Sequence, residues 1–374
     1  MAVLIDAHCH TVVAGELDAA AFELACTEAH LPAPAGTSYL DSQVGLAVRR
    51  WCAPALGLPR HAEIGDYLAR RSAVGWRAAT RTLLRSAGFE TLLVDTGLDG
   101  PDRLDTATLG DLAGAAVREV VRLEAVAEHV ASTGVDAAGF AAALAGVLER
   151  RTAHAVAVKS IIAYRAGLAV PAERPAAAEV RRAAGDWLRG GGGRLTDPVL
   201  LRHVLWAGVD TGLPLQVHTG FGDRDLALPA ADPAHLQPFL GAVDGPVVLL
   251  HCYPYHRQAG WLAQVYPHVY LDVGLTVGHL GVRAGAVLAE CFELAPFGKV
   301  LFSTDAYLLP ELYLIGAAQF RHSLRRMLDA WRADDAISAA DAARLTERVC
   351  AGTARRVYAL AAGGQRRPVR RRSS

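Results

Sequence analysis

The stretch Val3–His10, which is VLIDAHCH, decides how this sequence is interpreted. Its first five residues form a short, mostly apolar run with branched side chains, which is typical of a buried strand. Side chains alternate between the two faces of a strand, so His8 and His10 are predicted to point one way and Cys9 the other. Two imidazoles side by side at the end of a strand make half of a metal site.

Seven further runs of the same kind follow along the chain, separated by segments with helical periodicity. They lack the polar alternation of half-exposed strands, and this pattern indicates a parallel sheet covered by helices. Eight strand–helix pairs in one chain predict an α/β protein with a distorted (β/α)8 TIM barrel. The predicted strands are Val3–Ala7, Glu90–Asp95, Val120–Ala125, Ala155–Lys159, Pro214–His218, Val247–His251, His268–Asp272 and Lys299–Asp305.

The connection between the first two predicted strands is far longer than the few residues typical of such connections. Its helical patterns, for example Asp66–Ser86, predict a helical insertion over residues 16–89. Segments that follow barrel strands emerge on the catalytic face, so this insertion is expected to overhang the site as a cap. The barrel is expected to cover residues 1–362, followed by a disordered basic tail over 363–374.

Composition narrows the class of protein and its partners. The chain has 374 residues, 52% of them hydrophobic, and 38 basic residues balance 38 acidic ones. Such a chain buries a large core, and its zero formal charge indicates neither a nucleic-acid nor a membrane partner. With no evident signal peptide or membrane span, and six scattered cysteines, we expect a cytoplasmic protein. The expected partner is a small molecule, and a homo-oligomer formed through the insertion is left open.

Residues able to bind metal recur where the predicted strands end. In a parallel barrel these carboxyl ends converge on one mouth. Several imidazoles and a carboxylate gathered there fit a divalent metal, with Zn²⁺ as the first choice and Mn²⁺ or Fe²⁺ as alternatives. The candidates are His8 and His10 on strand one, Lys159 on strand four, His218 on strand five, His251 on strand six and Asp305 on strand eight.

The expected chemistry is attack by an activated water. A bound metal lowers the pKa of its water from about 16 to about 7 and polarises a substrate carbonyl. Asp305 would take a proton from this water and pass it to the leaving group. His251 is either a ligand of a second metal or the group that stabilises the developing oxyanion. Each residue also has a plainer interpretation, since strand histidines often belong to the core and Asp305 could cap a helix.

Lys159 stands out because the chain contains only one other lysine, Lys299, among its 38 basic residues. A lysine in an apolar strand of so arginine-rich a chain suggests chemistry specific to an ammonium group. Carbamylation, a Schiff base and a hydrogen-bond donor are the candidates. The structural alternative is that Lys159 partners a buried acid.

Together these motifs resemble the metal-dependent amidohydrolase superfamily, from Val3 to about Tyr358. Three longer stretches narrow the resemblance to the amidohydrolase 2 branch. Within that branch they are similar to the amidohydrolase-like domain fused to glutamine synthetase in some fungal and plant proteins. The three stretches are Val158–Leu168, Gln216–Asp223 and His251–Tyr255.

The resemblance implies a distorted (β/α)8 barrel with one metal ion, whose implied ligands are His8, His10, His218 and Asp305. His251 would then activate water or substrate. Lys159 matches the position at which dinuclear members carry a carbamylated lysine that bridges two metals, although its neighbours differ from the usual dinuclear sites. One or two ions are therefore compatible with the resemblance. Members of the branch hydrolyse C–N bonds, decarboxylate, hydrate or isomerise their substrates.

Substrate recognition is expected from residues just after strands four, five and six. Arg165, with Tyr164, would grip a substrate carboxylate in bidentate fashion. Asp223 would meet a substrate amine, and Tyr253 belongs to a polar–aromatic cluster after strand six. Such a set fits an amino-acid-like head group, for example a γ-glutamyl unit. In the plainer alternative, Arg165 and Asp223 pair with each other or with loop backbone.

The sequence thus predicts a metal-dependent, amidohydrolase-type enzyme that cleaves a C–N bond, with a γ-glutamyl amide as the candidate substrate. A second hypothesis is a metal-dependent, non-oxidative decarboxylase of a small carboxylic acid, in which Asp305 or His251 delivers a proton to the carbanion. A third is a catalytically silent barrel that serves as a binding module.

Overall fold

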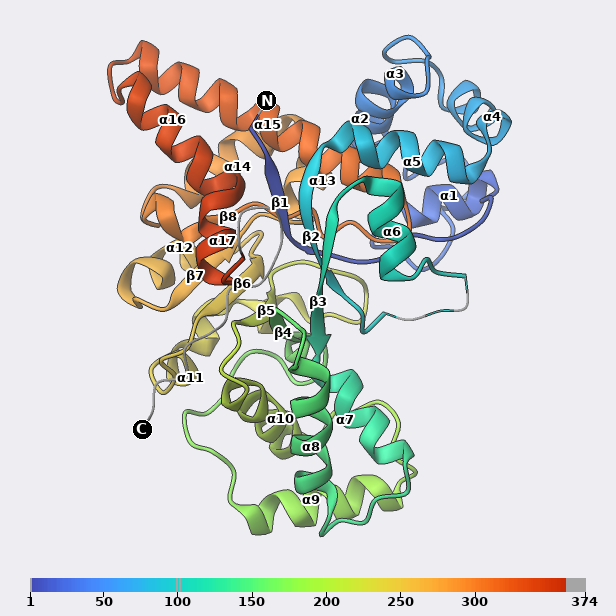
Figure 1. Ribbon diagram of the computed structural model, residues 1–374. Helices are drawn as coiled ribbons and strands as arrows, with labels where there is room; N and C mark the ends of the chain where they lie inside the picture. The colour runs from blue at the N-terminus through green and yellow to red at the C-terminus, as the bar shows by residue number, and fades with distance from the viewer. Residues whose placement is uncertain (1, 99, 101, 361–374) are drawn as a thin grey trace. The chain divides into compact units, whose positions relative to one another are not determined.

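The computed structural model describes residues 2–98, 100 and 102–360, so the expected tail over 363–374 lies outside the described residues. Eight strands form one sheet in the order of the chain, and helices follow the strands (Figure 1). The expected (β/α)8 barrel is therefore confirmed. The strands are β1 (Leu4–Cys9), β2 (Phe89–Asp95), β3 (Ala116–Arg122), β4 (Ala157–Ser160), β5 (Leu215–Thr219), β6 (Val247–His251), β7 (Val269–Asp272) and β8 (Val300–Leu301).

The strand pairs are parallel, and most strands are buried along their full length. Every residue of β1, β4, β5, β6 and β8 is buried. This explains why the strands appear in the sequence as nearly continuous apolar runs, because both faces are covered. The Ala7 N–H donates to the Phe302 carbonyl over 3.1 Å, so β1 also bonds to the backbone directly after β8.

Two predicted strands differ from the observed ones by more than two residues at one or both ends, and the others by two residues at most. The third was expected at Val120–Ala125 but covers Ala116–Arg122, and Leu123 already begins helix α7 (Leu123–Ser132). The first four residues of β3 are only half-buried, so they lack the apolar run on which the prediction relied. The eighth was expected over Lys299–Asp305 but contains only Val300–Leu301, because the backbone leaves the sheet before Asp305.

The contacts divide the chain into two units. Unit 1 covers residues 1–94, 98–118 and 272–374, and unit 2 covers residues 95–97 and 119–271. Besides its strands, unit 1 contains the insertion after β1, helix α6 (Thr106–Ala113) and the helices that follow β7 and β8. Its later helices are α13 (Thr276–Leu280), η5 (Gly281–Arg283), α14 (Ala284–Cys291), η6 (Phe297–Lys299), α15 (Pro310–Ala333), α16 (Ala339–Glu347), η7 (Arg348–Gly352) and α17 (Thr353–Val357).

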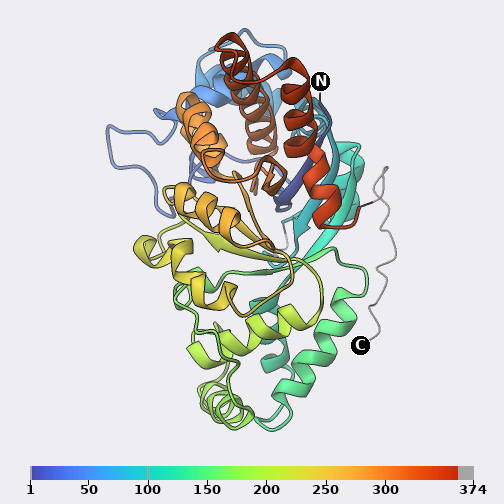
Figure 2. The ribbon, with the colours of Figure 1, turned by 90° about the vertical axis from the view of Figure 1, so that its left-hand side faces the viewer.

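The predicted helical insertion after β1 is confirmed. The helical pattern over 66–86 corresponds to two helices, which are separated at Gly75, whose φ is 82°. The insertion packs on α13 and α15, and both ribbon views show it beside α15 (Figures 1 and 2). Its helices are α1 (Ala19–Ala25), α2 (Gln43–Ala47), η1 (Val48–Cys52), α3 (Ala53–Ala55), α4 (Ile64–Val74) and α5 (Trp76–Ala87).

Unit 2 contributes the middle of the sheet, from the end of β3 through β6 and most of β7. Helix α10 begins where Asp197 accepts hydrogen bonds from the Val199 and Leu200 N–H groups, which is a regular N-cap. The inner strand residues Val158, Val217 and Leu249 have no exposed surface. Its helices are α7 (Leu123–Ser132), α8 (Phe140–Thr152), η2 (Ile162–Tyr164), α9 (Ala177–Arg189), α10 (Pro198–Asp210), η3 (Leu228–Ala231), η4 (Pro233–Leu236), α11 (Gln237–Leu240) and α12 (His256–Val265).

Two further observations concern the whole described chain. Over residues 2–98, 100 and 102–360, none of the helices combines the length and the apolar character that crossing a bilayer requires. All six cysteines lie within this part of the chain, and each is a buried free thiol. Cys9 has its Sγ 3.5 Å from the Leu93 carbonyl and is fully buried.

Candidate metal centre

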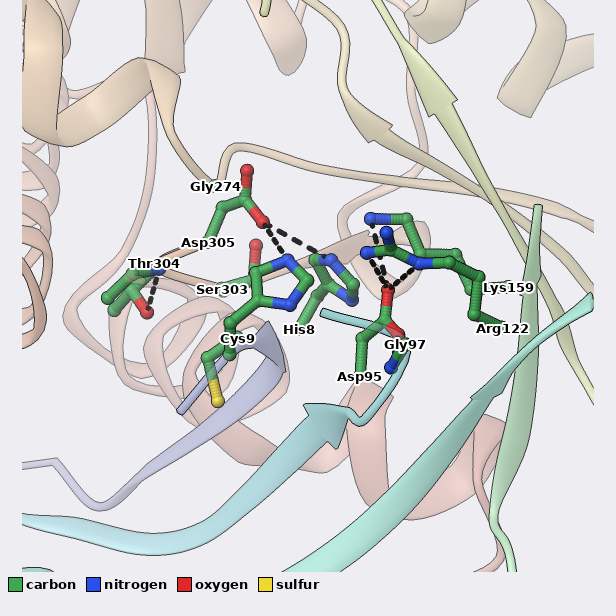
Figure 3. A network of polar contacts seen from close by, with 12 residues as sticks. His8, Cys9, Asp95, Gly97, Arg122, Lys159, Gly274, Ser303, Thr304 and Asp305 are labelled. Carbon is green, nitrogen blue, oxygen red and sulfur yellow. Dashed lines mark hydrogen bonds and ion pairs between the residues drawn. The ribbon is translucent and has the colours of Figure 1, made fainter. Parts of the chain in front are cut away.

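His8, His10 and Asp305 form a compact cluster in unit 1. The Nε2 atom of His8 lies 3.2 Å from Oδ1 of Asp305, and the Nε2 atom of His10 lies 3.3 Å from the same oxygen. Figure 3 shows this carboxylate directed at both imidazoles. As predicted from strand alternation, His8 of β1 and His10, which directly follows the strand, face the same carboxylate. The two rings stand nearly perpendicular, at 88°, with their centroids 5.0 Å apart.

Backbone hydrogen bonds hold the loop after β8 against β1. The Asp305 N–H donates to the His8 carbonyl over 2.9 Å, and the His10 N–H donates to the Ala306 carbonyl over 2.8 Å. Asp305 has a φ of 51°, in the left-handed region that non-glycine residues seldom adopt. Strain of this kind, of order 1–3 kcal/mol, persists where the surrounding contacts over-determine the conformation, often at functional sites.

Two buried carboxylates reinforce the same loop. Oδ1 of Asp6 accepts the Thr304 N–H over 2.9 Å, and its Oδ2 accepts the Thr304 hydroxyl. Asp272 accepts the Ser303 hydroxyl over 2.7 Å. Burial raises the pKa of the Asp6 carboxyl to about 8, although the hydrogen bonds from Thr304 act in the opposite direction. Both acids therefore position the residues that immediately precede Asp305.

Gly274 and Tyr313 complete the support of the cluster. A Cβ on Gly274 would lie 2.1 Å from the Ser303 Oγ and 3.3 Å from the Asp305 nitrogen, so a side chain there would collide with the loop. The fully buried Tyr313 of α15 donates its hydroxyl to the His10 carbonyl. Contacts from three separate segments thus determine where the Asp305 carboxylate lies.

The donor set fits a divalent transition metal. Each of the three residues offers one ligand atom, and these atoms all lie within 4.8 Å of one another. Two imidazole nitrogens and a carboxylate oxygen suit Zn²⁺, and they also suit Mn²⁺ or Fe²⁺. His8 is fully buried and His10 is 4% exposed, so the imidazoles are shielded from bulk water. The expectation of a divalent-metal site at these residues is supported, whereas the identity of the metal stays a prediction.

Lys159 belongs to a second cluster, which lies in unit 2. Its Nζ is 3.6 Å from Oδ2 of Asp95, and Arg122 donates to the same oxygen over 2.7 and 3.0 Å. Figure 3 shows both cationic side chains directed at this carboxylate. Asp95 has 1% of its surface exposed and Lys159 2%. The structure therefore places Lys159 beside a buried acid, which is the plainer of its two sequence interpretations, and its carbamylation stays a prediction.

His218 and His251 lie together at the ends of β5 and β6. Their ring centroids are 4.7 Å apart, and the Tyr164 ring is 4.5 Å from the His218 ring. His251 has a φ of 66°, which is a second strained conformation at a predicted site residue. Next to them, Gly220 has a φ of 73°, and a Cβ there would lie 2.3 Å from the Tyr253 carbonyl oxygen. Their assignment as metal-binding and catalytic residues stays a prediction.

The predicted substrate-binding residues have different surroundings. Arg165 pairs with Glu128 over 2.9 Å and donates to the Leu195 carbonyl over 3.3 Å, so Asp223 is not its partner. Asp223 is exposed and accepts the Asp225 N–H over 2.9 Å. Arg165 and Asp223 therefore do not pair with each other, because Glu128 lies beside the guanidinium, but each of them contacts loop backbone, as the plainer alternative also allowed.

The two tyrosines of that set are better placed for recognition. Tyr164 packs on His218, and its hydroxyl accepts the Asp223 N–H over 3.4 Å. Tyr253 is half-buried and stacks on His256, with ring centroids 5.8 Å apart and an interplanar angle of 6°. Aromatic rings with polar tips suit a substrate of mixed polarity.

Several residues of these clusters were missed from the sequence. Asp6, Asp95 and Asp272 lie at or near strand ends, as the predicted ligands do, so the same reasoning could have selected them. His279 of α13 is a further case: burial lowers its pKa, whereas the charge of Asp305 raises it. Tyr313 lies well inside a long helix, and no local signal in the sequence connects it with His10.

The chain is thus a parallel barrel in which the first strand leads to His8 and His10 and the last strand leads to Asp305. The chain belongs to the amidohydrolase family, whose Amidohydro_2 model matches residues 5–360. The resemblance drawn from the motifs is therefore confirmed. Protein fluG of Emericella nidulans is 43% identical over 117 residues, a segment that covers 30% of this chain and 14% of fluG.

Solved structures show the same fold. A protein from Lactobacillus casei ATCC 334, assigned as a metal-dependent hydrolase, superimposes with a TM-score of 0.82 and 29% identity, covering 96% of this chain and 95% of its own. The uronate isomerase of Thermotoga maritima has a TM-score of 0.62 at 15% identity, with 95% and 94% of the two chains covered. The glucuronate isomerase of Caulobacter crescentus has the same TM-score at 16% identity, with 96% and 91% covered. The two isomerases are similar in fold alone.

Proposed function

We propose that this protein is a metal-dependent hydrolase that cleaves a C–N bond of an amide. The observation that carries the proposal is the buried cluster of His8, His10 and Asp305, whose ligand atoms lie within 4.8 Å of one another. Membership of the amidohydrolase family and likeness to a relative assigned as a metal-dependent hydrolase support an enzyme with this chemistry.

In the proposed site, His8, His10 and Asp305 hold the metal, and Zn²⁺ is the first ion to test. When bound, the metal would activate a water at neutral pH and polarise the carbonyl of the amide. His218 as a further ligand, and Lys159 and His251 in a two-ion site, stay predictions that rest on the strand ends and on the family resemblance.

Asp305 is suited to move a proton. Its Oδ1 faces both imidazoles, and the side chain keeps 12% of its surface exposed. A carboxylate with this access would take a proton from the attacking water and deliver it to the leaving nitrogen. In the same proposal, His251 stabilises the negative charge that develops on the carbonyl oxygen.

As the substrate class we propose an amide that carries a carboxylate, with a γ-glutamyl amide as the first candidate. Arg165 uses its Nη1 for Glu128, and within the described residues the structure gives its buried Nε no acceptor. A guanidinium has five donors, so donors remain for a substrate carboxylate. Asp223, which is exposed, would meet the substrate amine, and Tyr164 and Tyr253 would line the site.

The test combines metal content with product analysis. We expect elemental mass spectrometry of protein purified without chelator to find one metal ion per chain, with His10→Ala losing it and the exposed His129→Ala retaining it. Incubation with γ-glutamyl amides should release an amine and an acid. Absence of any bound metal, even after Zn²⁺ is added, would refute the proposal. Release of CO₂ from a carboxylic acid, without amide cleavage, would identify a decarboxylase instead.

A further inference from the structure

A cavity on the outer side of α15 is not used by the proposed chemistry. Its volume is about 550 Å³, and it lies within unit 1, between α15, the start of α14 and η1 of the insertion. The helix begins at Pro310, just after the Asp305 loop. It reaches the cavity at Gln319, which lies about 14 Å further along the helix at about 1.5 Å per residue. Its polar lining residues are Arg50, Gln319, His322, Ser323 and Arg326.

The charge of this lining is of one sign. Two arginines contribute to it, and within the described residues no carboxylate lines the cavity. Arg325, on the same helix, adds a third guanidinium close to His322. Gathering like charges on a folded surface costs free energy unless a counter-charge binds, so a cavity lined in this way is suited to an anion.

Of the two guanidinium groups that line the cavity, that of Arg50 is half-buried and held by contacts, whereas that of Arg326 is exposed. Arg50 donates from Nη2 to Nε2 of His322 over 3.3 Å, and its guanidinium lies 4.3 Å from the ring centroid of Trp51. Because arginine only donates, Nε2 of His322 accepts, and its proton sits on Nδ1. Burial lowers the pKa of His322, and so do Arg50, Arg325 and Arg326. Each of these effects favours the neutral imidazole, which can accept the hydrogen bond from Arg50.

A chain of hydrogen bonds leads from Trp51 through Gln319 to Ser323, whose hydroxyl lines the cavity. Trp51 donates its Nε1–H to Gln319 over 3.4 Å, and Gln319 donates its Nε2–H to the Ser323 hydroxyl oxygen over 3.1 Å. Ser323 is 4% exposed, and within the described residues its own hydroxyl proton has no acceptor. Its oxygen already accepts a bond, so this buried hydroxyl presents a donor to the cavity that it lines.

Apolar side chains form the rest of the wall. Trp331, Met327 and Val282 line the cavity, and Gly285 leaves space opposite Ser323, because a Cβ there would reach the Ser323 Cβ only at 3.8 Å. We propose that this cavity binds a small organic anion, whose carboxylate or phosphate contacts Arg50, Arg326 and Ser323 while its apolar part packs on Trp331 and Met327.

The experiment is calorimetric titration of the full chain with phenyl phosphate at low ionic strength. We expect saturable binding, while the neutral isostere benzyl alcohol gives none. Arg326→Gln should weaken the affinity at least ten-fold, because it removes a charged donor from the cavity wall. Gly285→Val should weaken binding without altering any charge, because its methyl groups would lie against the Ser323 hydroxyl, and Gly285→Ala should retain it.

Arg332→Gln is the matched control, since it removes an exposed guanidinium from the same helix without changing this cavity. It should bind like the parent chain. Heat released equally by the parent chain, Arg326→Gln and Gly285→Val would mean that the probe binds elsewhere, and would overturn the proposal. Absence of saturable binding of phenyl phosphate, benzoate and inorganic phosphate would overturn it as well. Thermal melting of each variant separates loss of binding from loss of the fold.

Discussion

Asp305 combines three properties that seldom occur in one residue. It faces two imidazole nitrogens, it adopts a left-handed backbone conformation, and its neighbours on the amino side are held by two buried acids. A residue that only capped a helix would need none of these. The combination indicates that its position is fixed for a purpose other than folding.

We therefore expect Asp305→Asn to keep the fold and lose activity by roughly 100- to 10,000-fold, the range typical of a general base. The amide has nearly the same shape but cannot accept a proton from water. Steady-state kinetics against the best amide substrate measures the loss, with Asp329→Asn, an exposed acid of α15, as control. Retained turnover would assign the base to another residue.

Lys159→Arg tests the role of the lysine. Arginine keeps the positive charge beside Asp95 but cannot be carbamylated, and Arg122 shows that a guanidinium is compatible with this acid. We expect one metal ion per chain, in the variant as in the parent, measured by elemental mass spectrometry. A drop from two ions to one would instead identify a bridging carbamate.

At the scale of elements, contacts between the loop after β7 and the loop after β8 fix the conformation of both loops. Asp272 is the last residue of β7, and it bonds to Ser303 while Gly274 leaves room for that side chain. Gly274→Ala should displace Ser303 from Asp272 and loosen the Asp305 loop. We expect a competition titration to show that the affinity of this variant for the metal is at least ten-fold weaker than that of the parent chain. Its helix content should change little. Gly278→Ala, whose Cβ would meet its nearest neighbour only at 3.8 Å, is the matched control.

The insertion is anchored to the first turn of α15 by one buried acid. Glu311 has no exposed surface, and its Oε1 accepts the Tyr67 hydroxyl over 2.8 Å and the Arg71 Nε over 2.7 Å. Tyr307, in the loop that carries Asp305, also donates to the Thr27 carbonyl of the insertion over 2.8 Å. The insertion therefore contacts both the start of α15 and the loop before it.

Glu311→Ala should lower the free energy of unfolding by about 3–5 kcal/mol, because it leaves the buried Arg71 without its counter-charge. Urea denaturation measures the change. Arg174→Ala breaks a solvent-exposed pair with Asp210 and should cost under about 1 kcal/mol. Equal, small effects of the two substitutions would show that Glu311 does not anchor the insertion.

The pattern of apolar residues in the sequence predicted which strands and helices form, but it did not predict all of their boundaries. Continuous apolar runs located β1, β5 and β6 almost to the residue, because these strands are buried on both faces. The same criterion missed the half-buried start of β3, where Arg118 and Glu119 interrupt the run. It also could not foresee the break at Gly75, since a glycine inside a helical pattern does not by itself show a positive φ.

The candidate site likewise has features that could be predicted from the sequence and features that could not. Strand alternation predicted that His8 and His10 share a face, and the barrel order predicted that Asp305 would meet them. The partner of Arg165 could not be predicted, because Glu128 comes from a segment whose packing depends on the whole fold. The role of Tyr313 could not be predicted for the same reason, since only the placement of α15 brings its hydroxyl to the His10 carbonyl. A buried acid beside Lys159 was one of the two interpretations of that residue, and the structure identifies it as Asp95.

At the scale of the whole molecule, a bound metal should stabilise the fold. A ligand present at a thousand times its dissociation constant adds about 4 kcal/mol to the stability of the state that binds it. We expect chelation to lower the melting temperature by several degrees, and Zn²⁺ to restore it. His10→Ala should melt at one temperature with or without chelator. An unchanged melting curve of the parent chain after verified metal removal would contradict this.

The cluster of His8, His10 and Asp305 joins the two ends of a long stretch of polypeptide. Thr304 and the Asp6 carboxylate that holds it are 298 residues apart in the sequence. A ribosome adds roughly 5–20 residues per second, so the histidines emerge on the order of tens of seconds before the aspartate exists. During translation the imidazoles are therefore made long before their carboxylate partner, and a metal that needs all three residues could bind only after most of the chain has been synthesised.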